Sequence, residues 1–119
     1  MAKILIVDDN RELLEVVSLL LKKNGFEVET AASGMEANTI LPWARPDLLL
    51  MDVWLGFDDG RNVCRDIKRT NNNIPIILIS ATPNLLQNFK EYNADDAIEK
   101  PFDTQDLVNK INRLLRPAL

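Results

Sequence analysis

Four apolar runs of strand length, each ending on a polar side chain, constrain the fold of this chain more than any other feature. The central run covers residues 48–51 and ends on Asp52. The other three runs end on Asp8-Asp9, on Ser80 and on Lys100. A short continuous apolar run bounded by polar residues is typical of a strand buried on both faces, as in a parallel sheet. Since ligand sites of open α/β sheets lie beyond the carboxyl ends of the strands, these four ends predict one site.

Amphipathic segments of helical period separate these runs. They cover about residues 11–23, 34–41, 61–69, 83–92 and 103–115, and an alternating run over 26–31 predicts an additional edge strand. Pro42 is expected to end or kink the second helix, with Trp43 folded back over its end and covering the core. Thr82 as a cap and Pro83 at the first helical position predict the start of the fourth helix. Turn residues are expected at 71–73, and Arg116-Pro117 is expected to end the last helix.

Five strands alternating with five helices predict parallel βαβ units with right-handed crossovers. We therefore expect a single α/β domain over residues 1–119, with a doubly wound five-stranded parallel sheet of flavodoxin-like type and strand order 2-1-3-4-5. In this order the ends of strands one, three, four and five are neighbours. The predicted cleft between them is lined by Asp8, Asp9, Asp52, Ser80 and Lys100.

Three carboxylates in one cleft repel each other unless a cation compensates their charge. Oxygen ligands without sulfur or imidazole favour Mg²⁺. Asp9 and Asp52 are the expected direct ligands and Asp8 acts partly through water, while the backbone carbonyl of Trp54 is placed to be a further ligand. The sequence therefore predicts a magnesium site.

Lys100 would bring one positive charge from the far side of the cleft, and cations on both flanks keep Asp52 ionised and nucleophilic. Ser80 could then hydrogen-bond a phosphoryl oxygen. The predicted chemistry is transfer of a phosphoryl group to a carboxylate. Each residue alone also has an ordinary structural interpretation: Asp9 or Asn10 as a helix cap, Lys100 as a solvated lysine and Ser80 as a turn hydroxyl.

Composition excludes several other classes. The 119 residues have a net charge of −4 and 46% hydrophobic content, which fits one acidic globular domain and argues against a nucleic-acid surface. The single cysteine cannot form an internal disulfide, and the absence of histidine excludes imidazole chemistry. No apolar run reaches membrane-spanning length and no signal peptide precedes the first strand, so a cytoplasmic protein without membrane contact is expected.

At this point the motifs resemble a known family. Residues 4–10 (ILIVDDN), 49–52 (LLMD), 77–81 (ILISA) and 99–102 (EKPF) are similar to the receiver domain of bacterial two-component response regulators. The resemblance implies that a sensor histidine kinase or phosphotransfer protein donates its phosphoryl group to Asp52, with Mg²⁺ at Asp8, Asp9 and Asp52. It also implies a cis Lys100-Pro101 bond and a phosphoryl acceptor with at most self-dephosphorylation rather than an enzyme. Phosphorylation would shift the surface of helix four, strand five and helix five, which would contact a second copy or an output domain.

Two positions depart from the family pattern. Ala97 stands where an aromatic residue is usual, and a methyl group cannot gate a pocket as a ring does. Gly56 stands where proline is usual, and glycine would loosen the loop after Asp52.

Ala97 suggests one alternative function, a receiver-like docking domain that no longer switches. A magnesium-dependent aspartyl phosphatase is a weaker alternative, because residues 8–10 do not offer two carboxylates one residue apart. A flavin or nucleotide binder is weaker still, since no glycine-rich loop follows the first strand.

Overall fold

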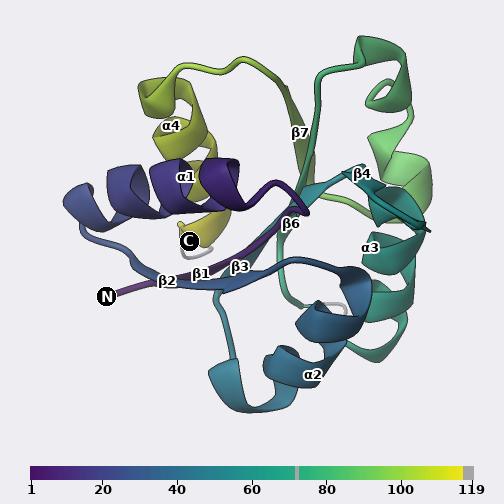
Figure 1. The fold of residues 1–119 in the computed structure, drawn as a ribbon, viewed down its shortest axis with the longest axis horizontal. Helices are drawn as coiled ribbons and strands as arrows, with labels where there is room; N and C mark the ends of the chain where they lie inside the picture. The colour runs from purple at the N-terminus through teal and green to yellow at the C-terminus, as the bar shows by residue number, and fades with distance from the viewer. Residues whose placement is uncertain (72, 117–119) are drawn as a thin grey trace.

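The computed structural model describes residues 1–71 and 73–116. Five parallel strands form one sheet in the order β2-β1-β3-β6-β7 (Figure 1). They are β1 (Lys3–Val7), β2 (Glu27–Ala31), β3 (Leu48–Asp52), β6 (Ile76–Ser80) and β7 (Asp96–Glu99). Counted within this sheet alone, the order is 2-1-3-4-5, so the predicted fold class and topology are confirmed. Asn72 of the turn predicted at 71–73 and Pro117 of the predicted end of the last helix lie outside the described residues.

Helices cover both faces of the sheet. The α1 helix (Arg11–Lys23) and the α4 helix (Thr104–Leu115) lie on one face, and α2 (Gly34–Ala44) and α3 (Gly60–Thr70) on the other (Figure 1). Every residue of β3 and β6 is buried, which explains their continuous apolar sequences. Among the described residues, no helix has both the length and the apolar character needed to cross a membrane.

Polar caps begin the four α-helices of the described part of the chain. The side chains of Asn10, Ser33, Asp59 and Asp103 each accept a hydrogen bond from a backbone N–H of the first turn. At α1 the bond runs from the Leu13 N–H to Asn10 Oδ1 at 3.2 Å. Because Asn10 caps this helix, the neighbouring Asp9 carboxylate is available for another role.

The prediction of a fourth helix over residues 83–92 is wrong. Two short 3₁₀ helices stand there instead, η1 (Pro83–Leu85) and η2 (Phe89–Tyr92). The Thr82 side chain forms no cap bond, and the segment contains the weak helix formers Asn84 and Asn88. The left-handed backbone of Asn93, with φ 64°, then ends the segment. The surface predicted to respond to phosphorylation therefore consists of η1, η2, β7 and α4.

The end of α2 also differs from the prediction. The helix passes through Pro42 and ends at Ala44, before Arg45 in the left-handed conformation with φ 47°. A proline in the last turn removes a single backbone hydrogen bond near solvent, where water can replace it. Trp43 does not fold over the core, because 65% of it is exposed.

Residues between β3 and α3 form a hairpin rather than a loose loop. The two strands are β4 (Trp54–Leu55) and β5 (Asp58–Asp59), paired antiparallel with Trp54 opposite Asp59. Gly56 has φ 71° at the first position of the two-residue turn, where this conformation favours glycine. The glycine therefore shapes a defined turn after Asp52.

An ion pair between the buried Lys68 ammonium and the partly exposed Asp95 carboxylate joins α3 to the loop before β7, and we expect it to stabilise the fold. Asp95 Oδ2 accepts from Lys68 Nζ at 2.7 Å and from the Ile76 N–H at 2.9 Å, and the Lys68 side chain is only 7% exposed. Removing a carboxylate that accepts from two buried donors is costly, so Asp95→Ala should lower the free energy of unfolding by about 1 to 2 kcal/mol.

The matched control is Asp66→Ala. Asp66 pairs with Arg69 at 3.5 Å, but both side chains are about two-thirds exposed, so the loss should stay below about 0.5 kcal/mol. Urea unfolding of both variants measures the difference, and equal losses would contradict this account.

Candidate functional site

Three carboxylates meet at the carboxyl ends of β1 and β3. One oxygen from each of Asp8, Asp9 and Asp52 lies within 4.8 Å of the other two. Asp8 is 2% exposed and Asp52 is 5% exposed, whereas Asp9 lies at the surface. The two strands are neighbours in the sheet, with Val7 opposite Met51, so the residues that follow them share one edge. The predicted carboxylate cluster is present.

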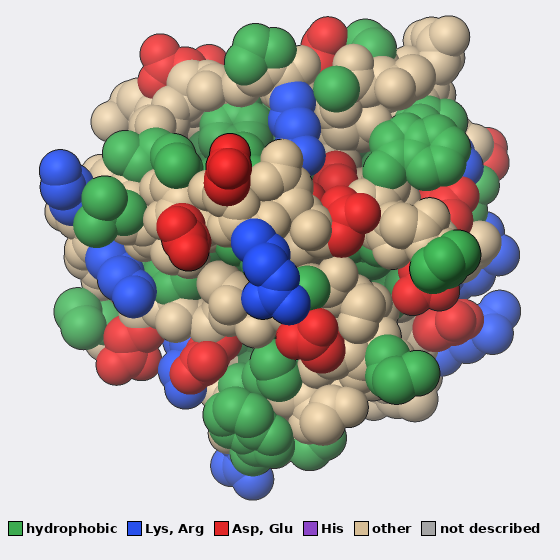
Figure 2. Space-filling view, in the orientation of Figure 1, with side chains coloured by type: hydrophobic (Ala, Val, Ile, Leu, Met, Phe, Trp, Pro, Cys, Tyr) green, Lys and Arg blue, Asp and Glu red, His purple; other side chains and the backbone are tan. Residues whose placement is uncertain are grey.

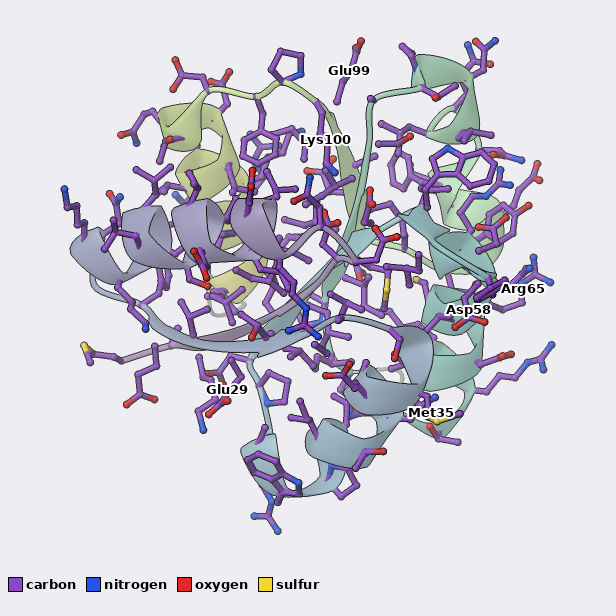
Figure 3. The ribbon with its side chains drawn as sticks, viewed as in Figure 1. Glu29, Met35, Asp58, Arg65, Glu99 and Lys100 are labelled. Carbon is purple, nitrogen blue, oxygen red and sulfur yellow. The ribbon has the colours of Figure 1, made fainter. Side chains whose placement is uncertain are left out.

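Lys100 reaches this cluster from the end of β7. Its ammonium lies 3.0 Å from Asp8 Oδ2 and 3.3 Å from Asp52 Oδ1. Figure 3 labels Lys100 at the carboxyl end of the sheet, and in the same orientation Figure 2 shows acidic side chains beside a basic one there. The Lys100 N–H also donates to the Ser80 carbonyl at 2.9 Å, and the Lys100-Pro101 bond is cis, as the family resemblance implied. Lys100 is therefore held in an ion pair, which excludes the alternative interpretation of Lys100 as a solvated surface lysine.

Ser80 and Trp54 lie near the same edge of the sheet. Ser80 is the last residue of β6, is fully buried, and accepts from the Thr82 N–H through its hydroxyl at 3.0 Å. Trp54 begins the hairpin two residues after Asp52, and 60% of it is exposed. Direct contact of the Ser80 hydroxyl and the Trp54 carbonyl with a bound group stays a prediction.

The electrostatics of the cluster favour a bound cation. The pKa of Asp52 is raised from 3.8 to about 6, mainly by burial and then by the nearby Asp8 carboxylate, while the Lys100 ammonium partly opposes both effects. One ammonium thus does not fully compensate three carboxylates. A small divalent cation that accepts only oxygen ligands, such as Mg²⁺, fits this donor set and would favour the ionised form of Asp52.

Two features that support the site were not predicted from the sequence. A β-carbon on Gly60 would overlap the Asp52 carbonyl oxygen, and the Gly60 N–H donates to the Val53 carbonyl at 2.7 Å. Asp59 both caps α3 and binds Arg61 through two parallel hydrogen bonds. The available signal was the run Asp59-Gly60-Arg61 at the start of the helix predicted over residues 61–69. The close approach of Gly60 and the hydrogen bonds of Asp59 together hold α3 against the end of β3.

Replacing Asp52 tests how much its buried charge destabilises the folded chain. Because its pKa is raised in the folded state, its ionisation favours unfolding as the pH rises from about 4 to about 6. In EDTA at about pH 7, Asp52→Asn should therefore raise the free energy of unfolding by about 1 to 2 kcal/mol, a value reduced for screening by water in the open cleft.

This gain should shrink below about pH 6 and vanish below about pH 4, where the parent carboxyl is protonated in both states. Denaturant unfolding at several pH values measures it, with the exposed Asp66→Asn as the control. A gain that does not change with pH, or a loss of stability at neutral pH, would contradict the assignment.

Comparison with known proteins identifies the family. A family model described as the response regulator receiver domain matches residues 4–112. Response regulator MprA of Mycobacterium avium (strain 104) is 35% identical over 116 residues, which are 96% of this chain and 51% of that protein. The chain thus spans about half the length of the curated relatives it matches.

Solved structures agree with this result. The receiver domain of NtrX from Brucella abortus has a TM-score of 0.90 at 29% identity, over 97% of this chain and 99% of that one. A putative response regulator from Chloroflexus aurantiacus J-10-fl has a TM-score of 0.89 at 32% identity, over 96% of this chain and 97% of that one. With the matching family model and the carboxylate cluster, these similarities show that the chain belongs to the response regulator receiver domain family.

Proposed function

We propose that this receiver domain accepts a phosphoryl group on Asp52 from a sensor histidine kinase or a phosphotransfer protein. The observation that supports it most directly is the position of the Asp52 carboxylate. It is buried at the end of a central strand, beside the Asp8 and Asp9 carboxylates and 3.3 Å from the Lys100 ammonium. A buried carboxylate with its charge compensated by positioned cations is suited to nucleophilic attack.

In the proposed reaction an Asp52 oxygen attacks the phosphorus of a phosphohistidine. The new oxygen–phosphorus bond forms as the phosphorus–nitrogen bond breaks, and the electron pair of that bond returns to the imidazole of the donor. Lys100 offsets negative charge near Asp52, and the Ser80 hydroxyl hydrogen-bonds a phosphoryl oxygen. When bound, Mg²⁺ supplies positive charge to the transferred oxygens; Asp8, Asp9, Asp52 and the Trp54 backbone carbonyl are its proposed ligands. The chain acts as an acceptor and not as a turnover enzyme.

The added charge is proposed to alter the surface formed by η1, η2, β7 and α4. The Ser80 hydroxyl already binds the Thr82 N–H, so moving this hydroxyl toward a phosphoryl group would release the start of the η1 segment. A second copy of the chain or an output domain is the proposed partner of this surface. The greater length of the MprA relatives is consistent with an output domain.

A docking domain that does not switch is the second candidate. It is favoured by Ala97, a small, half-buried residue that packs against the core between the sheet, α2 and α3. A methyl group at this position has no alternative rotamers, so it cannot swing inward behind Ser80. In this candidate the carboxylate cluster binds a cation but accepts no phosphoryl group.

Acetyl phosphate with Mg²⁺ separates the candidates. The parent chain should gain the mass of one phosphoryl group, Asp52→Asn should gain none, and Asp66→Asn, whose carboxylate is exposed on α3, should behave as the parent does. Mg²⁺ alone should raise the melting temperature, because it binds the folded carboxylate cluster in preference to the unfolded chain.

A parent chain that gains no mass but is stabilised by Mg²⁺ would favour the docking domain. Sustained hydrolysis of a free phosphate ester would favour a phosphatase instead, and both outcomes would contradict the acceptor function.

A further inference from the structure

Arg61 connects the hairpin that follows Asp52 with the η2 segment. Its guanidinium binds both carboxylate oxygens of Asp59, with Nε 3.0 Å from Oδ1 and a terminal nitrogen 2.7 Å from Oδ2. The same guanidinium lies over the Tyr92 ring, 5.0 Å from the ring centroid. Only 18% of the Arg61 side chain is exposed, so a planar cation is held between a carboxylate and an aromatic ring.

Asp59 links this arginine to the carboxylate site. It pairs with Trp54 in the hairpin, caps α3 and precedes Gly60, whose N–H binds the Val53 carbonyl next to Asp52. The hydrogen bonds from Arg61 hold the pKa of Asp59 below its usual value, so this carboxylate stays ionised. Fixing Asp59 thereby fixes the β4–β5 hairpin, which contains the proposed carbonyl ligand of Trp54.

Tyr92 links the arginine to the segment that replaces the predicted fourth helix. The Arg65 guanidinium also lies over the ring, at 4.5 Å, and its buried Nε has no hydrogen-bond partner among the described residues. The Cys64 thiol lies 3.5 Å from the Tyr92 carbonyl. Figure 3 labels Arg65 and Asp58 on the same edge of the molecule. Two guanidinium groups thus contact one ring, so Tyr92 links both arginines of α3 to the η2 segment.

We propose that Arg61 is a positioning residue of the phosphoacceptor site and that Tyr92 couples it to the η1–η2 segment. The coupling runs from the hairpin through Asp59 and Arg61 to Tyr92, and it does not involve position 97. This proposal rests on the proposed function. Since coupling between two sites is reciprocal, a group bound at Asp52 also changes the surroundings of the Tyr92 ring.

Four variants test the proposal, all made in a Trp43→Phe background so that Trp54 is the single indole. Arg61→Lys keeps the charge but cannot form the two parallel bonds to Asp59. Tyr92→Leu removes the ring, whereas Tyr92→Phe keeps it. Arg69→Lys is the matched control, because Arg69 is an exposed arginine of the same helix.

The first measurement is Mg²⁺ affinity, which is monitored through the fluorescence of Trp54. Arg61→Lys should weaken binding about tenfold, as loss of an outer-shell partner does at metal sites. Tyr92→Leu should weaken it about threefold, whereas Tyr92→Phe and Arg69→Lys should stay within about twofold of the parent. The second measurement is amide hydrogen exchange of residues 53–59 in EDTA, which should accelerate in Arg61→Lys and Tyr92→Leu alone.

Beryllofluoride with Mg²⁺ gives the reciprocal measurement. It should shift the Tyr92 ring resonances of the parent and shift them less in Arg61→Lys. Parent-like affinity and hairpin exchange in Arg61→Lys would overturn the proposal, and so would equal effects of Tyr92→Phe and Tyr92→Leu. If the parent bound neither Mg²⁺ nor beryllofluoride, the proposed function would fail, and unchanged exchange in EDTA would separately overturn the positioning role.

Discussion

Electrostatic repulsion among three carboxylates at one edge of a sheet is the constraint on which this structure depends. Asp8 and Asp52 are almost completely buried, and a single ammonium from Lys100 only partly compensates them. The surrounding fold holds the carboxylates there, because β1 and β3 are hydrogen-bonded neighbours with apolar side chains on both faces. We expect this arrangement to lower the stability of the chain without a cation, and its oxygen ligands fit a small divalent cation.

Most of the sheet and the clustered site residues could be predicted from the sequence, because both follow from strands buried on two faces. Residues at the ends of such strands meet at one edge whatever the details of the helices. The segment 83–92 could not be predicted in this way. Its Thr-Pro start is typical of a helix, but Thr82 does not cap it, and its Tyr92 ring packs against two arginines of α3 instead. The prediction for Trp43 was wrong for a related reason, since a large apolar side chain near a helix end is not necessarily buried.

The two departures from the family pattern have different consequences. Gly56 serves the hairpin turn, where a positive φ suits glycine, so it is compatible with an ordered acceptor site. Ala97 stands on β7 where the family usually has an aromatic ring, while the aromatic Tyr92 of η2 contacts Arg61 and Arg65. The carboxylate site thus keeps the cluster on which the proposed phosphoryl transfer depends, while the proposed connection from the site to the surface differs from the family pattern.

Locating the acyl phosphate within the chain tests the central claim most directly. Borohydride reduces an aspartyl phosphate to the corresponding alcohol, so reduction after treatment with acetyl phosphate and Mg²⁺ converts the modified aspartate to homoserine. Peptide mass spectrometry should then find homoserine at position 52 and an unchanged aspartate at positions 8 and 9. Homoserine at another position, or an unmodified Asp52 under conditions that add a phosphoryl group to the chain, would contradict the account.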